Sequence, residues 1–391
     1  MSAQEISVDT VRSLMLHAQG LLHPPAAHAT KEDVLSAIDR ISLLQIDTIN
    51  VVARAPYLAL WSRIGDYDPT WLEDLLSEGR IFEYWAHAAC FIPIDQYRYH
   101  RRMMLDRVRY HRYREWYLDH QADTDQILEH IRQHGAVRSA DFERKDGKKG
   151  TWWDWKIEKD ALEYWLAAGD VMVSRREKFQ RVYDLRERVH PAWEDLNTAA
   201  YDESMRYFVL RSIQAMGIAK PEWLPDYYRL SKADAAAAVR SLLEEGAISE
   251  IRVAGWPEPA LISRESLSLL NDSSADLRPT LNTLLCPFDS LIWDRKRTRE
   301  LFNYDFSIEC YLPQAKRKYG YYLLTALYRG QMVARLDVKA HRQQGAFEVK
   351  AIYWELGLQV TDEMRTEVLA AVQRCADWHR TPELRLPDSL A

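Results

Sequence analysis

Leu166-Ala-Ala-Gly169-Asp-Val-Met-Val173 is the stretch that best indicates how this chain folds. A helix is expected to end at the glycine, which supplies a left-handed residue, and a short apolar strand follows it. The same order of helix end, glycine and strand recurs at residues 75–83, around Gly79, and at residues 243–251, around Gly246. The chain therefore predicts three similar units.

The residues on either side of these glycines predict what each unit contains. Residues 124–134 and 155–168 have the pattern of two helices, and so do residues 202–216 and 231–245, where Ser231 can cap the second helix. Strands are expected at residues 171–173 and 181–185. Helices followed by a β-hairpin form the winged-helix plan, a helix-turn-helix variant that commonly contacts nucleic acid.

The pattern changes after residues 271–275, which have the composition of a linker. Residues 321–327, 332–338 and 346–353 predict strands, with Gly330 and Gly345 at the turns, and residues 363–375 predict a helix. We therefore predict an α+β fold of three tandem winged-helix units and a C-terminal β-barrel-like module. The expected bounds are 1–120 (unit 1 with a basic linker helix), 121–190 (unit 2), 191–270 (unit 3) and 271–391 (the module).

Composition limits the class of protein. The 391 residues include 52 Lys and Arg against 58 Asp and Glu, a net charge of −6, and 47% are hydrophobic, which excludes an intrinsically disordered chain. We expect no membrane span, and the acidic start predicts no signal peptide, hence a cytoplasmic protein. The four cysteines form no CxxC motif, and the chain has no GxGxxG or Walker loop, so we expect neither a metal nor a cofactor.

Basic residues gather with aromatic residues in a few segments, although the chain as a whole is acidic. Residues 97–117 carry seven arginines against two acids, and a second basic group falls on the predicted wing of unit 2. Arginine beside tyrosine suits phosphate contact and base stacking. The alternative is a solvated helix whose tyrosines pack on neighbouring elements. We expect DNA contacts from Arg98, Arg101, Arg102, Arg175, Arg176 and Lys178.

Gln45 and Asp47, within Leu43-Leu-Gln-Ile-Asp-Thr-Ile-Asn50, are the candidate catalytic residues. In an extended segment their side chains project together, because side chains alternate between faces. The amide can then hold a water molecule that the carboxylate orients or deprotonates. The alternative is a helix-capping Asp47 with a solvated Gln45. His87, after a predicted strand, is a candidate support residue of the same cleft, with a purely structural histidine as the alternative.

Several of these segments resemble the AlkZ-like DNA glycosylases. Gln45-Ile-Asp47 is similar to the QxD signature of the branch called YcaQ or AlkX, and residues 83–87, 286–295, 316–322 and 337–342 are similar to further family segments, so the resemblance covers nearly the whole chain. One departure is His341, where the family pattern has an acid. The resemblance implies three winged helices with a C-terminal β-barrel. It also implies hydrolysis of the N-glycosidic bond of N7-alkylguanine, including the unhooking of interstrand crosslinks, by Gln45 and Asp47.

The resemblance sets further expectations about partners. The partner is double-stranded DNA with alkylated or crosslinked guanine, and Arg54, His341 and Arg342 join the expected DNA contacts, with the turn at residues 341–344 probing a groove. Because the motif contains no lysine, we expect a monofunctional glycosylase without lyase activity. We expect a monomer, associated with the nucleoid. The alternatives are a winged-helix transcription regulator without catalysis and a different hydrolase that uses Asp47 and His87.

Overall fold

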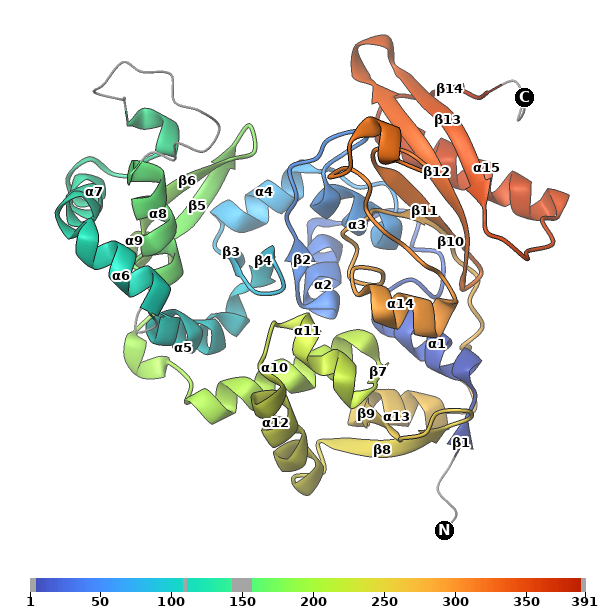
Figure 1. Cartoon of the computed structure of the whole chain (residues 1–391), viewed down its shortest axis with the longest axis horizontal. Coiled ribbons are helices and arrows are strands. Elements are labelled where there is room, and N and C mark those ends of the chain that lie inside the picture. The colour runs from blue at the N-terminus through green and yellow to red at the C-terminus, as the bar shows by residue number, and fades with distance from the viewer. Residues whose placement is uncertain (1–4, 108–110, 143–156, 388–391) are drawn as a thin grey trace. The chain divides into compact units, whose positions relative to one another are not determined.

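The computed structural model describes residues 5–107, 111–142 and 157–387 (Figure 1). The chain divides into two compact units. The first contains Met1–Pro69, Ala86–Ala89 and Phe208–Ala391, and the second contains Thr70–Trp85 and Cys90–Tyr207. Both units combine helices with short sheets, so the predicted α+β class is confirmed. In the described part of the chain, no helix is long and apolar enough to cross a membrane.

The first unit begins with three helices, and the first two of them start at capping residues. The Ser7 side chain accepts a hydrogen bond from the backbone of Thr10, and Thr30 and Asp33 form a capping box. A short strand, β2, lies between the second and third helices and is followed by a loop. These elements are α1 (Val8–Ala18), α2 (Lys31–Ile41), β2 (Leu44–Gln45) and α3 (Ala55–Ile64).

The third predicted repeat lies mainly in the first unit. Ser231 caps its second helix as predicted, because the Ser231 Oγ accepts from the backbone N of Asp234 at 3.0 Å. Two antiparallel strands follow Gly246 and belong to a four-stranded sheet of order β1-β8-β9-β7. The elements are β1 (Glu5–Ile6), α10 (Tyr201–Met216, of which the first seven residues belong to the second unit), β7 (Ile218–Ala219), α11 (Leu224–Tyr227), α12 (Lys232–Glu244), β8 (Ile248–Val253), β9 (Ala260–Ser263) and α13 (Arg264–Asn271).

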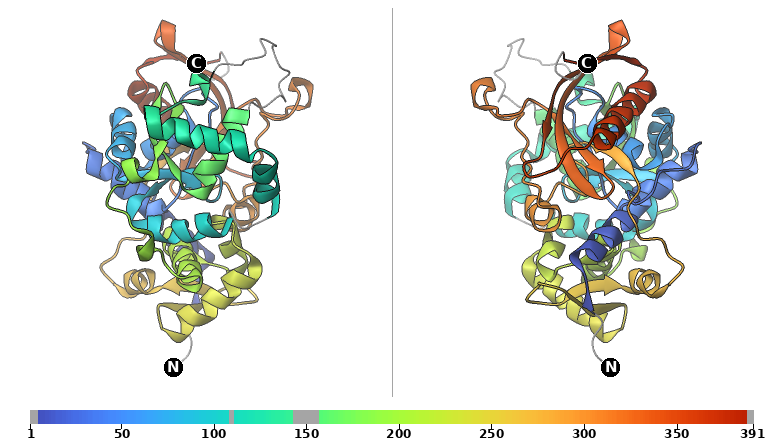
Figure 2. Two further views of the ribbon diagram at one scale, coloured as in Figure 1. Left: turned by 90° about the vertical axis from the view of Figure 1, so that its left-hand side faces the viewer. Right: turned by 90° about the vertical axis from the view of Figure 1, so that its right-hand side faces the viewer.

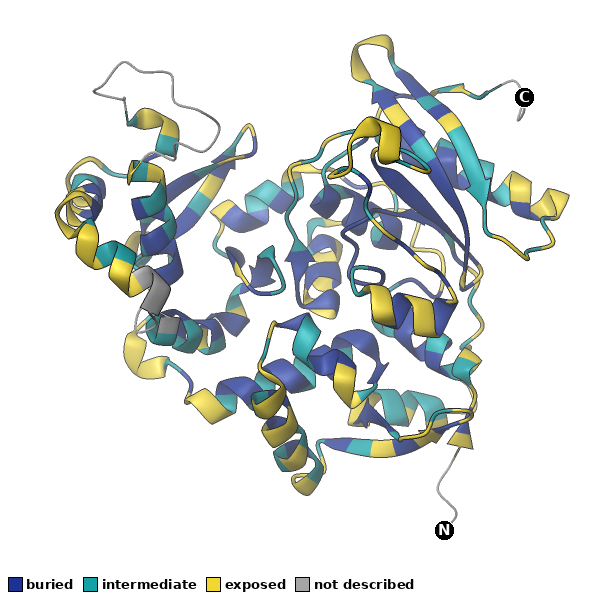
Figure 3. Ribbon diagram, viewed as in Figure 1, coloured by how far each residue is buried: buried dark blue, intermediate teal, exposed yellow. Residues whose placement is uncertain are grey.

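The C-terminal part of the first unit is a five-stranded sheet of order β10-β11-β12-β13-β14. Every residue of β11 is buried (Figure 3), and α15 packs on one face of the sheet (Figure 2). The three predicted strands and the closing helix are confirmed. The elements are β10 (Asn282–Leu285), α14 (Arg295–Phe302), β11 (Leu323–Tyr328), β12 (Gln331–His341), β13 (Ala346–Trp354), α15 (Asp362–Trp378) and β14 (Glu383–Arg385).

The second unit contains the first two predicted glycine stops. Gly79 and Gly169 follow helices with φ of +69° and +77°, and Gly246 in the first unit has φ of +63°, so all three are left-handed as predicted. Each is followed by a strand, whereas the division into winged-helix units stays a prediction. The elements are α4 (Thr70–Ser77), β3 (Ile81–Trp85), β4 (Ala89–Pro93), α5 (Tyr97–Arg107), α6 (His111–Asp119), α7 (Gln121–His134), α8 (Ile157–Ala168), β5 (Val171–Glu177), β6 (Gln180–Leu185) and α9 (Arg186–Val189).

Candidate active site

Gln45 and Asp47 lie at the end of the short strand β2 and in the loop that follows it. Gln45 ends β2, and the backbone N of Ile46 donates to the O of Ala89 at 2.7 Å. Both polar side chains belong to half-buried residues. The next helix, α3, begins eight residues after Asp47 and has Arg54 at its N-cap, so the helix-capping alternative for Asp47 is wrong.

The Asp47 carboxylate is oriented by its own loop and is partly desolvated. Its Oδ1 accepts a hydrogen bond from the backbone N of Ile49 at 2.8 Å, which forms an Asx turn. Burial raises the pKa of the Asp47 carboxyl above its ordinary value, and the bond from Ile49 opposes that shift. The result is a fixed carboxylate that is more basic than a solvated aspartate.

The Gln45 amide is the complementary polar group of the motif. Among the residues that the structure describes, none hydrogen-bonds the Gln45 side chain. Its carbonyl oxygen and its NH₂ group are therefore both available to solvent or substrate. An acceptor and two donors beside a carboxylate can fix the orientation of one water molecule.

The Asp47 charge acts on residues from the C-terminal half of the first unit. The Asp47 charge raises the pKa of the Cys310 thiol and of the Tyr311 phenol, in both cases after the larger effect of burial. It also contributes to the raised pKa of Tyr322 and of Cys286, which are fully buried. None of these four residues was expected from the sequence to belong to the site. No local pattern could have found them, because they are far from Asp47 in sequence.

The His87 side chain is buried and contacts Trp293 and Asp226. Its ring stacks on Trp293 with centroids 4.0 Å apart, and its Nδ1 lies 3.0 Å from the O of Asp226. Burial lowers the pKa of His87, and the Asp226 carboxylate opposes that shift. Within residues 5–107, 111–142 and 157–387, no interaction joins His87 to Asp47. These contacts fit a structural histidine, and its support of the active site stays a prediction.

The hairpin between β12 and β13 holds the loop that follows the motif. The predicted turn lies at Arg342–Gln344, and Arg342 Nη2 donates to Asn50 Oδ1 at 2.6 Å and to the O of Val52. The backbone N of Ala340 also donates to the O of Val51 at 3.1 Å. The hairpin therefore fixes the three consecutive residues 50–52.

Two further predicted DNA contacts lie at the same hairpin and loop. The charge of Arg54 lowers the pKa of Arg342, after the larger effect of burial, so the two guanidinium groups are close. His341 Nε2 lies 2.9 Å from Glu348 Oε2. The structure thus groups Arg54, Arg342 and His341 near the motif loop in the first unit.

Four of the predicted cations in the second unit have accessible side chains. Arg175 is paired with Glu177 at 2.7 Å, and Lys178 lies exposed at the tip of the β5–β6 hairpin with φ of +50°. Arg98 is paired with Glu203 at 3.1 Å, and the half-buried Arg102 with Asp106 at 2.6 Å. Exposed ion pairs of this kind are weak and can exchange for a phosphate contact.

The other two cations in the second unit are structural. Arg101 is buried, donates to both carboxylate oxygens of Asp195 at 2.8 and 2.9 Å, and donates to the O of Ala168. Arg176 is buried and donates to Glu83 Oε2 at 3.0 and 2.7 Å. Because these guanidinium groups are enclosed and fully paired, we correct the expectation that Arg101 and Arg176 contact DNA.

Comparison with known proteins shows the family and the fold. A family model described as "DNA glycosylase AlkZ-like" matches residues 38–378, nearly the whole chain. Among solved structures, the chain is similar to the DNA glycosylase AlkZ of Streptomyces sahachiroi, with a TM-score of 0.65 and 13% sequence identity. That match covers 98% of this chain and 100% of the other. At this identity the structural likeness concerns the fold.

Proposed function

We propose that this chain, which belongs to the AlkZ-like DNA glycosylase family, hydrolyses the N-glycosidic bond of N7-alkylguanine in double-stranded DNA, including guanine in interstrand crosslinks. The observation that carries the proposal is the half-buried Gln45 at the end of β2, followed after two residues by the partly desolvated carboxylate of Asp47, which the N–H of Ile49 holds. A DNA glycosylase acts in repair, and we propose as its lesion a base whose bond to the sugar is already weakened by alkylation.

The proposed mechanism depends on the charge of the substrate. Alkylation at N7 makes guanine cationic and therefore a good leaving group, so the enzyme needs to stabilise an oxocarbenium-like sugar and deliver water. A carboxylate about 4 Å from that cation contributes roughly 4 kcal/mol at an effective dielectric near 20. This is of the order of a thousandfold in rate. Asp47 supplies this stabilisation, and Gln45 orients the water that attacks the sugar.

The proposed DNA contacts are the cations that remain accessible. Arg54 and Arg342 lie close together beside the motif loop, and a phosphate between them would offset their mutual repulsion. His341 is next to this pair. In the second unit we propose Arg98, Arg102, Arg175 and Lys178. The protein acts as a monomer on nucleoid DNA in the cytoplasm and has no lyase activity, since the motif contains no lysine.

Incubation with a duplex that carries one N7-methylguanine tests this function. The wild-type protein should release the free base and leave an abasic site in an intact strand, and Asp47→Asn should abolish release while duplex binding survives. A duplex with one interstrand crosslink tests unhooking in the same assay. A transcription regulator would leave the lesion in place and would bind a preferred sequence. Strand cleavage without added base would contradict the monofunctional mechanism.

A further inference from the structure

The connection from α14 to β11 carries an unusual concentration of exposed apolar side chains. Tyr311 is 76% exposed, Leu312 40% and Tyr321 41%, and these are three of the nine large apolar side chains exposed in the described part of the chain. A cluster of this kind generally marks a binding surface, whereas single exposed apolar residues need no explanation. We name residues 310–321 the tyrosine loop.

The tyrosine loop is fixed to the C-terminal sheet at its base. Glu309, which is buried, accepts hydrogen bonds through Oε2 from the backbone N of Tyr319 at 2.9 Å and of Gly320 at 3.2 Å, so both ends of the loop meet at one carboxylate. A Cβ at Gly320 would lie 2.7 Å from Asp337 Oδ2, so glycine is required at this close approach.

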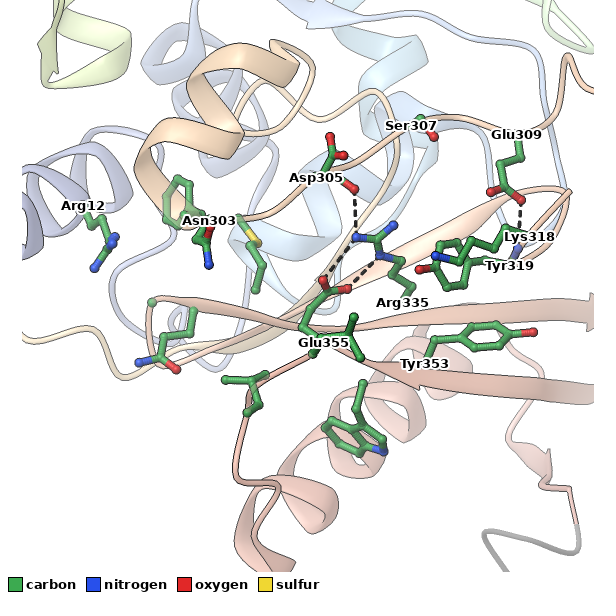
Figure 4. Close-up of a pocket in the computed structure, with 17 residues that line it drawn as sticks. Arg12, Asn303, Asp305, Ser307, Glu309, Lys318, Tyr319, Arg335, Tyr353 and Glu355 are labelled. Atoms are coloured by element: carbon green, nitrogen blue, oxygen red, sulfur yellow. Dashed lines mark hydrogen bonds and ion pairs between the residues drawn. The ribbon is translucent and has the colours of Figure 1, made fainter.

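The same base is packed against β12 and β13. The Tyr319 ring lies 5.1 Å from the ring of Tyr353, and the Arg335 guanidinium lies 4.7 Å from the Tyr319 ring centre while it is paired with Glu355 at 2.7 Å (Figure 4). The exposed tyrosines are therefore displayed by an anchored loop, which reduces the entropy that they lose on binding.

An internal contact across the loop distinguishes its two exposed tyrosines. Arg317 Nε donates to the O of Leu312 at 2.9 Å, and the Arg317 guanidinium lies 4.9 Å from the centre of the Tyr321 ring. Tyr321 is thus already engaged by a cation. Tyr311, the more exposed of the two, has no ring contact among the described residues.

Packing contacts link the tyrosine loop to the loop that carries Asp47. Cys286 Sγ lies 3.6 Å from the O of Ala55, the first residue of α3, and the ring of Phe288 lies 6.3 Å from the ring of Tyr322, which directly follows the tyrosine loop. In agreement with this packing, the Asp47 charge raises the pKa of the Cys310 thiol and of the Tyr311 phenol, after the larger effect of burial. The exposed Tyr311 ring and the Asp47 carboxylate therefore belong to one region of the first unit.

We propose that Tyr311 is a positioning residue for the damaged base, which stacks on its ring, and that this contact favours cationic purines. The proposal rests on the glycosylase function above and adds how the enzyme holds and selects its substrate. N7-alkylguanine combines a flat aromatic surface with a positive charge, and the face of an aromatic ring attracts both. Loss of the ring should weaken lesion binding by roughly 5- to 150-fold, the range found for single base-stacking contacts.

Affinity measurements in the full-length Asp47→Asn protein test this contact without turnover. Three matched duplexes are compared, which carry N7-methylguanine, its neutral isostere 7-methyl-7-deazaguanine, or guanine. Tyr311→Leu should weaken binding of the N7-methylguanine duplex by the stated factor and reduce the preference for the cation over the isostere. It should leave binding of the guanine duplex unchanged. Tyr311→Phe should retain the preference, and Leu356→Ala, at a 98% exposed residue of the same unit, is the matched control.

The outcomes separate this proposal from the proposed function. If the protein with native Asp47 excises N7-methylguanine but Tyr311→Leu changes neither the affinity nor the cation preference, the stacking role is wrong and the glycosylase function stands. If no lesion is excised while Tyr311→Leu still removes a measurable cation preference, the catalytic proposal fails and the binding site stands. An equal loss of affinity on all three duplexes would make Tyr311 a general DNA contact and would overturn the selective role.

Discussion

Arg63 and Asp289 form a two-bonded ion pair that is closed to solvent, with Arg63 Nη1 2.6 Å from Asp289 Oδ2 and Nη2 2.9 Å from Oδ1. Arg63 lies in the last turn of α3, and Asp289 lies in the segment that begins with Cys286 beside Asp47. Arg63 also donates to the side chain of Gln19 at 3.0 Å. The pair therefore joins the helix after the motif loop to a segment more than 200 residues away.

Arg63→Met should destabilise the protein strongly, because it leaves the Asp289 carboxylate buried without a counter-charge. Breaking one side of a buried pair typically costs about 3–5 kcal/mol. Chemical denaturation measures the free energy of unfolding. The double variant Arg63→Met with Asp289→Asn should recover part of the loss. A single variant within 1 kcal/mol of the wild type, on the order of a surface substitution, would contradict the structural role.

The rate of base release should fall as the pH is lowered. The fall should occur at a higher pH than it would if the catalytic carboxylate had the pKa of an ordinary aspartate. The proposed mechanism uses ionised Asp47, and desolvation raises the pKa of this carboxyl, so protonation begins above the ordinary value of about 3.9. Single-turnover release of N7-methylguanine, corrected for spontaneous loss, measures the acid limb of the pH profile.

His379 is the control for this profile. Burial, followed by the charge of Arg342, lowers the pKa of His379 to about 4, so it also titrates on the acid side. His379→Gln should leave the acid limb in place if Asp47 causes it. If the fall in rate at low pH disappears in His379→Gln, the group that titrates is His379 and not Asp47.

Replacing Arg175 and Lys178 together by glutamine should weaken binding of all duplex sequences. Each phosphate contact that is lost should reduce the slope of log K against log salt by about 0.9. Titrations at several salt concentrations measure this slope. Arg176→Gln is the contrasting variant, because its guanidinium is buried on Glu83, and it should lower the free energy of unfolding with little change in the slope. An unchanged slope in the double variant would place the DNA-binding surface elsewhere.

Arg342→Gln separates loop positioning from phosphate contact. Because Arg342 fixes Asn50 and Val52, its loss should displace the motif loop and lower kcat by about 10- to 100-fold, the effect of small misplacements in active sites. Lys339→Gln, at an exposed cation on β12 of the same hairpin, is the control. A change confined to KM would show that Arg342 contacts DNA without holding the loop.

Features that depend on neighbouring residues could be predicted from the sequence. Ser231 caps its helix because the hydroxyl reaches the N–H three residues later, and Gly79, Gly169 and Gly246 end helices because glycine tolerates positive φ. The short strand that ends at Gln45 follows from alternation over a few residues. These signals are local, so they can be recognised in the sequence without knowledge of the tertiary structure.

The environment of each charged residue could not be predicted in the same way. Arg101 and Arg176 have the sequence pattern of surface cations, yet both are buried because Asp195 and Glu83, about 90 residues away, supply their counter-charges. The Asp47 charge acts on Cys286, Cys310, Tyr311 and Tyr322, which are far from it in sequence. A charged side chain can be buried only where a partner of opposite charge is present. When that partner is distant in sequence, the residues next to the charged side chain do not reveal that it is buried.

The contact between Arg342 and Asn50, 292 residues apart, also has a consequence for synthesis on the ribosome. Gln45 and Asp47 are translated early, whereas the arginine that holds their loop is added roughly 15 to 60 seconds later at ordinary elongation rates. A nascent or prematurely terminated polypeptide that stops before the hairpin therefore contains the motif without its support. Full support of the motif loop is thus acquired only near the completion of translation.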